Sequence, residues 1–249
     1  MFNKEQVKNI FLNSFQNLFC RGEILKAEKL VNYCIPLELE NDSLILEVKD
    51  QVNKRVNEVR NWNILGRPTP NSYATIPEPL DLPKLKLTYN KIKEIETKTI
   101  LDIGCYTADF LKLLAKEGYE CYGIDIHKEL MEKLNEECNG NPQFIFSRVE
   151  RLPQIWSNKF DVVIALDVLE HCLNIHTAIY SIEEVIKEGG LIIINLPILE
   201  EFYVDESYEH LRMFSENHIN KLFGSKKDFK LENSFDEFGR KTNFITYSK

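Results

Sequence analysis

The amino-acid sequence predicts an α/β protein: a doubly wound, seven-stranded and mostly parallel sheet, preceded by a helical extension. From residue 97 onward, strand-like and helix-like segments alternate, as they do when helices on both faces of a sheet connect parallel strands. Before residue 63, apolar residues recur at three- and four-residue spacing, which indicates amphipathic helices. We therefore expect a helical extension over 1–62, a Pro-rich connector over 63–96 and an α/β domain over 97–249.

The composition is that of an ordinary globular protein. A chain of 249 residues with 43% hydrophobic and 28% charged residues can bury a core of its own. The net charge of −8 offers no positive field to a nucleic-acid backbone, which disfavours a nucleic-acid partner. The six cysteines form no Cys-x-x-Cys pair, and the first twenty residues contain no continuous apolar run. We expect a cytoplasmic protein with reduced thiols and no membrane anchor.

Three helices are expected in the extension. The first two are separated by Gly22, and the third, over about 41–60, begins at the capping residues Asn41-Asp42-Ser43. Five of the nine prolines follow in a short span, and because proline fixes φ and disrupts a helix interior, they predict an extended connector. The connector is interpreted as a linker, with a strap across the active site as the alternative.

The α/β domain is expected to begin with a buried strand and to end with a hairpin. An antiparallel strand pair, joined by a turn at 236–240, is expected to close the sheet. The expected strands are Thr99–Ile103, Cys121–Asp125, Phe144–Phe146, Val162–Leu166, Leu191–Asn195, Phe229–Phe235 and Asn243–Tyr247, and the expected helices are Asp109–Glu117, Lys128–Glu137, Thr177–Lys187 and Ser215–Phe223.

A nucleotide-type site is predicted at the end of the first strand. In Ile-Leu-Asp-Ile-Gly-Cys-Tyr-Thr-Ala-Asp-Phe, over 100–110, a buried strand carries Asp102 near its end and runs into a turn at Gly104. About twenty residues later Asp125 ends the second strand, where a carboxylate accepts hydrogen bonds from ribose hydroxyls. A dinucleotide-binding Gly-x-Gly-x-x-Gly would need three glycines, and this loop has only Gly104.

These segments resemble the class I S-adenosylmethionine-dependent methyltransferases, which have a Rossmann-like fold. Two further segments strengthen the resemblance: Phe-Asp-Val-Val-Ile-Ala-Leu-Asp-Val-Leu-Glu-His over 160–171 and Glu-Gly-Gly-Leu-Ile-Ile-Ile-Asn-Leu-Pro over 188–197. The resemblance covers about residues 97–249. It implies S-adenosylmethionine as the cofactor and S-adenosylhomocysteine as the product.

The resemblance also implies a role for particular residues. Asp102 and Gly104 would frame the methionine end of the cofactor, with Cys105 and Tyr106 as loop and wall, while Asp125 would bind the ribose and Ile126 would pack on the adenine. Val149 and Glu150 would lie beside the adenine, and Leu166 and Asp167 beside the methyl group. Tyr106 and Ala108 stand where the family often has glycine, so the loop must accept a Cβ at both positions.

The run Asp-Val-Leu-Glu-His over 167–171 is similar to the Glu-x-x-Glu-His stretch of ubiquinone-biosynthesis-type O-methyltransferases. In those relatives the acids and the histidine are associated with a divalent cation, and such ligands would suit magnesium, manganese or zinc. The other interpretation is that Glu170 and His171 hold the loop by hydrogen bonds. We predict no metal ligand here and retain the cation as the alternative.

Two histidines are candidate general bases. His171 lies in that run, and His210 begins the segment His-Leu-Arg-Met-Phe-Ser, which resembles a substrate-side stretch of small-molecule methyltransferases. Arg212 in the same segment either anchors an acidic group of the acceptor or fixes the loop.

The sequence thus predicts a methyltransferase that acts on a small molecule or glycan precursor, on oxygen. The alternative is a non-catalytic, methyltransferase-like subunit that binds a partner, and a hydride-transferring enzyme is the third interpretation. No membrane partner is expected, and the N-terminal helices are a candidate homodimer contact.

Overall fold

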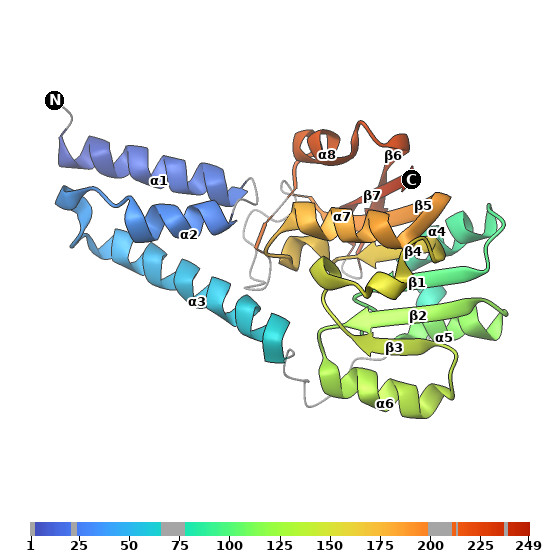
Figure 1. The fold of residues 1–249 in the computed structure, drawn as a ribbon. Coiled ribbons are helices and arrows are strands. Elements are labelled where there is room, and N and C mark those ends of the chain that lie inside the picture. Colours follow the sequence, from blue (N-terminus) through green and yellow to red (C-terminus); the bar gives the residue numbers. More distant parts are fainter. Residues whose placement is uncertain (1–2, 21–23, 66–77, 199–210, 213, 237–238) are drawn as a thin grey trace.

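The computed structural model describes residues 3–20, 24–65, 78–198, 211–212, 214–236 and 239–249 (Figure 1). The N-terminal part folds as three helices, α1 (Lys4–Cys20), α2 (Ile24–Tyr33) and α3 (Ser43–Leu65), with a 3-10 turn at Leu37–Leu39. Their apolar faces share a core that includes Phe11, Val31 and Val56. The three expected helices are present, and Asp42 caps α3 by accepting hydrogen bonds from the backbone NH groups of residues 44 and 45.

The expected connector is helical near its end. A 3-10 turn (Pro79–Asp81) leads into α4 (Pro83–Lys93), and Pro83 lies in the first turn of that helix, where a missing NH costs nothing. Leu85 and Ile92 of α4 belong to the core against the sheet. The prediction of an extended chain through residue 96 is therefore wrong over 83–93, while residues 66–77 lie outside the described part.

The sheet has seven strands in the order β3-β2-β1-β4-β5-β7-β6. The first five strands pair in parallel, and β7 pairs antiparallel with both β5 and β6, which confirms the predicted architecture. The strands are β1 (Thr99–Ile103), β2 (Glu120–Asp125), β3 (Gln143–Phe146), β4 (Phe160–Leu166), β5 (Ile186–Pro197), β6 (Lys227–Phe235) and β7 (Lys241–Ser248).

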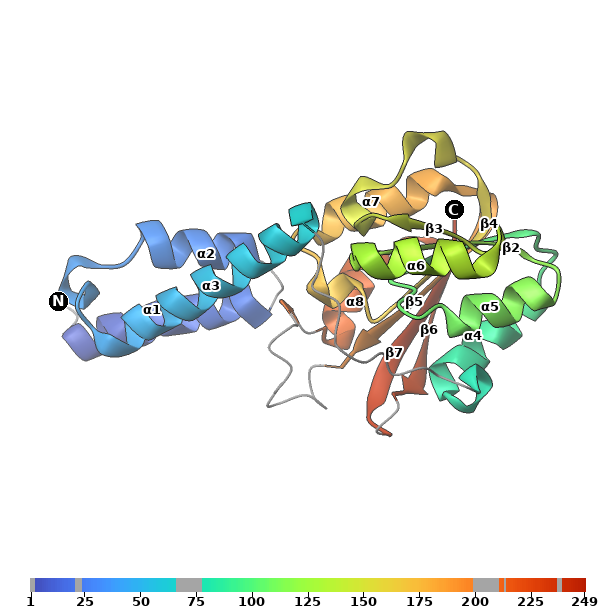
Figure 2. The ribbon, with the colours of Figure 1, turned by 90° about the horizontal axis from the view of Figure 1, so that it is seen from below.

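Helices cover both faces of the sheet (Figures 1 and 2). On one face, α4 packs with α5 (Asp109–Lys116) and α6 (Lys128–Cys138) over the sheet. On the other face, α7 (Ile175–Val185) and α8 (Glu216–Phe223) pack with Trp156. The helix expected to reach Lys187 ends at Val185, because Ile186 already pairs with Phe160 in the sheet.

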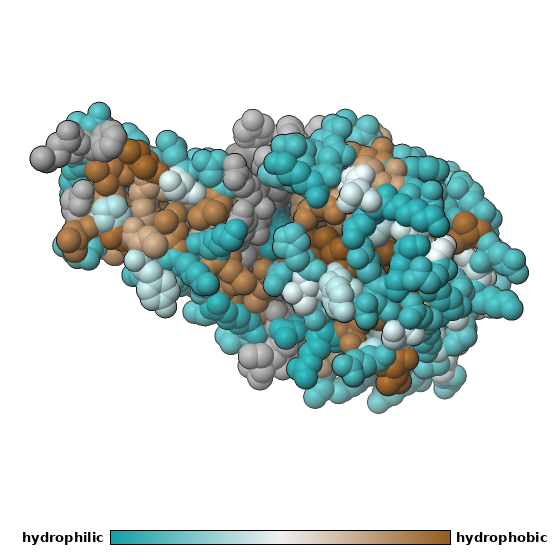
Figure 3. Space-filling view, turned by 45° about the horizontal axis from the view of Figure 1, so that its top comes forward, coloured by the Kyte–Doolittle hydropathy of each residue, from teal (hydrophilic) through white to brown (hydrophobic). Residues whose placement is uncertain are grey.

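The helices α1–α3 lie beyond the carboxyl ends of the parallel strands (Figure 1). Leu211 is fully buried in the helical core, and Leu173 packs against it, so residues of the α/β domain join the two parts. Hydrophobic side chains also cover part of the outer surface of these helices (Figure 3). Among the described helices, none is long and apolar enough to cross a membrane.

Candidate functional site

The loop after β1 takes a left-handed backbone at alternate residues. Gly104, Tyr106 and Ala108 have φ angles of 75°, 44° and 57°. A Cβ at Gly104 would lie 2.6 Å from Cγ2 of Val168, so this position accepts only glycine without a shift of its neighbour. Tyr106 and Ala108 adopt a conformation that costs an L-residue about 1–2 kcal/mol. The loop therefore keeps the backbone of a glycine-rich loop although it carries side chains at two of the three positions.

Asp125 ties this loop to the end of β2. One carboxylate oxygen accepts a hydrogen bond from the backbone NH of Tyr106 at 3.0 Å. The other accepts from the backbone NH of His127 at 3.0 Å and lies 2.6 Å from Nδ1 of the His127 ring. A carboxylate has about four acceptor positions, so the oxygen that faces Tyr106 keeps capacity for a ligand hydroxyl.

Asp102 is a buried acid behind the loop. Its neighbours in the sheet are Gly123 of β2 and Ile164 of β4. Burial, followed by the nearby negative charge of Asp125, raises the pKa of Asp102 to about 8. Cys105 is also buried, its Sγ lies 3.9 Å from the sulfur of Met131, and burial raises the pKa of its thiol, so it packs rather than reacts.

The raised pKa of Asp102 predicts a stability that falls with pH. The folded chain keeps this proton up to about pH 8, whereas an unfolded chain loses it near 3.8. The folded state thus binds more protons between these values, and the free energy of unfolding decreases as pH rises, by up to about 1.4 kcal/mol per pH unit. Urea unfolding from pH 5 to 8 should show this decrease, and Asp102→Asn should flatten it. If the free energy of unfolding changed with pH in the same way in the wild type and Asp102→Asn, the prediction would be contradicted. Asp50 is exposed, and Asp50→Asn serves as the control.

A cavity of about 220 Å³ opens at the carboxyl ends of β1, β2 and β4. Eight of the candidate residues line it: Gly104, Tyr106, Asp125, Ile126, Val149, Glu150, Asp167 and His171. Asp102, Cys105 and Leu166 are not among the lining residues, and His210 lies outside the described residues. The structure thus collects residues from the ends of β1 and β2 and from the loops that follow β1, β2, β3 and β4 around one cavity.

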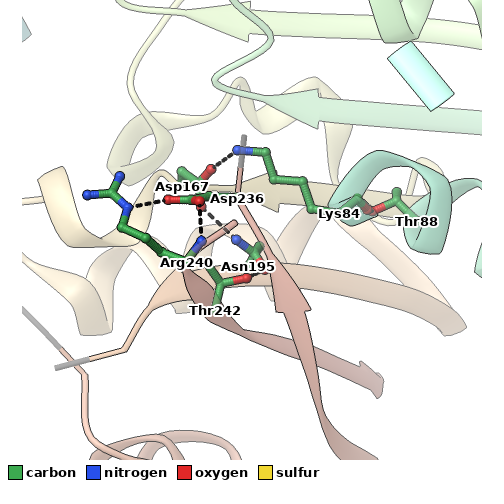
Figure 4. A network of polar contacts seen from close by, with 7 residues as sticks. All are labelled: Lys84, Thr88, Asp167, Asn195, Asp236, Arg240 and Thr242. Carbon is green, nitrogen blue, oxygen red and sulfur yellow. Dashed lines mark hydrogen bonds and ion pairs between the residues drawn. The ribbon is translucent and has the colours of Figure 1, made fainter. Parts of the chain in front are cut away.

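Asp167 follows β4 and is held by a polar network (Figure 4). Its Oδ2 pairs with the ammonium group of Lys84, and its Oδ1 accepts a hydrogen bond from the side-chain amide of Asn195. Its backbone is left-handed, with φ of 56°. Both oxygens of this candidate ligand therefore have partners within the protein.

The loop that follows Asp167 is held by hydrogen bonds. The guanidinium group of Arg212, which is 2% exposed, donates to the backbone oxygens of Leu169 and Leu173. The backbone NH of Leu211 donates to the backbone oxygen of Glu170 at 2.8 Å. Burial, followed by the charge of Asp167, raises the pKa of the Glu170 carboxyl well above its usual value. These contacts support the loop-fixing interpretation of Arg212.

Sequence reasoning missed several residues of the site, among them His127, Lys84 and Val59. His127 braces Asp125 and lines the cavity, and its position two residues after the candidate ribose acid was the available signal. Lys84 comes from the unpredicted helix α4. Val59 of α3 also lines the cavity, which only tertiary structure reveals.

Comparison with known proteins gives a family match. A model of the family described as "Methyltransferase domain" matches residues 81–240. The ubiquinone biosynthesis O-methyltransferase of Rickettsia typhi is 32% identical over 113 residues, which are 45% of this chain and 45% of that protein. The protein of the same name from Vibrio cholerae is 31% identical over 111 residues. The chain spans about half the length of the curated relatives it matches.

Solved structures with similar folds cover most of the α/β domain. A protein of Pyrococcus horikoshii aligns with a TM-score of 0.54 and 18% identity over 69% of this chain and 89% of its own. An S-adenosylmethionine-dependent methyltransferase of Methanosarcina mazei aligns with a TM-score of 0.52 and 18% identity, covering 64% of this chain and 96% of its own. At this identity the similarity supports the fold.

Proposed function

This chain belongs to the class I S-adenosylmethionine-dependent methyltransferase family, and from that premise we propose that it transfers a methyl group to an oxygen of a small molecule or glycan precursor. The observation that carries this proposal is the cavity at the carboxyl ends of β1, β2 and β4. It joins Gly104, a buried carboxylate at Asp125, and His171. In open α/β sheets, ligands bind at this edge.

The residues around the cavity fit the cofactor. Asp125 retains acceptor capacity toward a ribose hydroxyl, and Ile126 and Val149 give an apolar lining for an adenine. At Gly104 the absence of a Cβ lets the backbone approach Val168 at the cavity wall. The cofactor, when bound, supplies an activated methyl group.

The chain's own part in the reaction is alignment and exclusion of water. Asp125 holds the loop that carries Tyr106, and Asp167 is fixed at the wall of the same cavity. His171 lines the same cavity and is the proposed base for an acceptor hydroxyl. His210 stays a prediction, since it lies outside the described residues.

Oxygen as the acceptor atom is supported by the names of the relatives. The Rickettsia and Vibrio proteins are O-methyltransferases, although the match covers under half of each. The net charge of −8 favours a small acceptor over a nucleic acid. Cys172 and Val59 also line the cavity. Because Val59 belongs to α3, the N-terminal helices provide part of the wall that an acceptor would meet.

Thermal unfolding with S-adenosylmethionine, S-adenosylhomocysteine and NAD tests the cofactor. A ligand at one hundred times its Kd adds about 2.7 kcal/mol to the free energy of unfolding. For a chain of this size the Tm should rise by roughly 5–10 °C. We expect this rise with the two S-adenosyl compounds and none with NAD. A rise with NAD alone would refute the proposal, and the absence of any rise would favour a subunit without a cofactor.

An acceptor screen tests the reaction itself. Small hydroxylated molecules and glycan precursors would be incubated with S-adenosylmethionine, and S-adenosylhomocysteine would be measured. Release that depends on the acceptor supports the proposed function. Tight cofactor binding without release on any acceptor would point to the non-catalytic alternative.

A second copy of this chain is the proposed partner of the N-terminal helices. Tyr33 and Leu37 are 85% and 81% exposed there, and apolar side chains so exposed favour an interface. Sedimentation should give a dimer for the wild type and a monomer for a variant with Tyr33→Glu and Leu37→Glu. Ile155, 88% exposed on the α/β domain, provides the control Ile155→Glu, which should stay dimeric. A wild-type monomer at all concentrations would contradict this proposal.

A further inference from the structure

The acidic loop after β4 carries a cation of its own. Lys84 lies in the first turn of α4, and its ammonium group is 2.5 Å from Oδ2 of Asp167. Thr88, which is fully buried one turn later, donates its hydroxyl to the backbone oxygen of Lys84 at 2.8 Å. The side chain of Lys84 is 13% exposed and that of Asp167 is 34% exposed, so the contact is partly shielded from water. Figure 4 shows Lys84 reaching Asp167 from α4.

The second oxygen of Asp167 is fixed from the opposite side. The side-chain amide of Asn195 in β5 donates to Oδ1 at 2.7 Å. Thr242 of β7 donates its hydroxyl to the amide oxygen of Asn195 at 3.0 Å, and this contact sets which way the amide faces. A chain of contacts thus runs from β7 through β5 to Asp167 and ends at the ammonium group on α4. The carboxylate has one cationic partner and one neutral donor, each on its own oxygen.

The donors of this loop do not fit a divalent cation. Magnesium or manganese at the run 167–171 would need oxygens of Asp167 together with Glu170 and His171. Lys84 and Asn195 already bind the two oxygens of Asp167. Asp167 and His171 line the cavity, but Glu170 is fully buried and is not among the lining residues. Within the described part of the chain, no three acidic, histidine or cysteine side chains are arranged to hold a metal.

We propose that Lys84 is a positioning residue that serves Asp167 in place of a divalent cation. Its ammonium group balances the carboxylate charge and holds it at the cavity wall, so the site receives its cation from α4 of the same chain. An ammonium group donates up to three hydrogen bonds but does not coordinate several oxygens as a metal ion does. Lys84 is not among the residues that line the cavity, so its ammonium group orients Asp167 without contacting the acceptor. The inference deepens the proposed function and rests on it where cofactor binding is measured.

The first arm of the test measures cation binding alone. Manganese chloride would be titrated by calorimetry into the wild type, Asp167→Asn, Lys84→Met and Lys86→Met, each in its full-length form. Lys86 is exposed on the same helix and is the matched control. We expect that neither the wild type nor Lys86→Met binds manganese at a saturable site that depends on Asp167. A saturable site in the wild type that disappears in Asp167→Asn would overturn the proposal.

The second arm measures the affinity for S-adenosylhomocysteine. Lys84→Met should weaken it by about tenfold, equivalent to about 1.4 kcal/mol, because Asp167 loses its orientation at the cavity wall. Lys86→Met should leave it unchanged, and EDTA should have no effect on the wild type. Equal affinities for Lys84→Met and Lys86→Met would overturn the proposal. If the wild type binds no S-adenosyl compound, the proposed function fails, while the manganese arm still decides the role of Lys84.

Chemical rescue distinguishes the loss of the hydrogen bond to Asp167 from a defect in folding. Lys84→Ala would be assayed with propylammonium, which can donate hydrogen bonds to Asp167, and with tetramethylammonium, which cannot. We expect several-fold recovery of S-adenosylhomocysteine affinity with propylammonium only. Thermal unfolding of each variant identifies any that does not fold, and Lys84→Arg, which keeps the charge, then replaces it and should bind more tightly than Lys84→Met. The same response to both ammonium ions would show that hydrogen-bond donation to Asp167 is not the role of Lys84.

Discussion

Replacing Asp125 by alanine is expected to lower the affinity for S-adenosylhomocysteine by roughly ten- to one-hundredfold and the free energy of unfolding by about 2–4 kcal/mol. The substitution removes the acceptor of three contacts, from the backbone NH groups of Tyr106 and His127 and from the His127 ring. Buried donors left without a partner cost about 1–3 kcal/mol each. Calorimetric titration and urea unfolding would measure the two effects.

Two further variants separate binding from folding at this position. Asp125→Asn keeps one acceptor oxygen and should retain more stability than the alanine variant, while still losing affinity. Asp50 is exposed on α3, and Asp50→Ala should change neither quantity. Unchanged cofactor affinity in Asp125→Ala would show that this carboxylate does not bind the ribose and serves only to shape the loop.

Replacing Arg212 by methionine is expected to lower the free energy of unfolding by about 3 kcal/mol, because it removes a buried guanidinium group and leaves two backbone oxygens without their donors. The two terminal nitrogens of Arg212 donate to the oxygens of Leu169 and Leu173, on either side of the buried Glu170. The loss corresponds to a fall in Tm of roughly 6–12 °C for a chain of this length.

The stability that Arg212 provides should depend on the planar geometry of its guanidinium group. One ammonium group does not reproduce a planar fork with donors on both arms, so Arg212→Lys should recover little of the lost stability. Arg151 is exposed, and Arg151→Met provides the control measured by the same thermal scan. A Tm of Arg212→Met that equals the control would mean that the loop after β4 is held by other contacts.

The strands could be predicted because their signal is local. The strand Thr99–Ile103 was predicted at both ends, since a short apolar run bounded by Gly104 is readable from the sequence alone. The antiparallel pair at the end of the sheet was predicted from its turn residues. Ser215, the first residue of the predicted helix Ser215–Phe223, caps α8 by accepting a hydrogen bond from the backbone NH of His218. Where residues close in sequence determine the conformation, the residue pattern is sufficient to predict the element.

The rest depends on neighbours that are distant in sequence. Pro83 was interpreted as a break, although in the first turn of α4 it is compatible with a helix whose burial against the sheet the sequence does not reveal. The partnership of Lys84 with Asp167 joins residues 83 positions apart. Tyr106 and Ala108 have positive φ angles, a conformation that favours glycine, so their residue types do not reveal the backbone of this loop.

Because Val59 lines the cavity from α3, the sequence of the N-terminal helices can change separately from that of the loops after the strands. The other lining residues come from strand ends and the loops after strands, whereas Val59 comes from a helix whose own core lies elsewhere. Substitutions in α1–α3 can therefore reshape one wall while the loops at Gly104 and Asp125 remain unchanged. Under the proposed function, selection acting on these helices would have a route to new acceptors that leaves cofactor recognition intact, and exchanging the helices between homologues would test this separation directly.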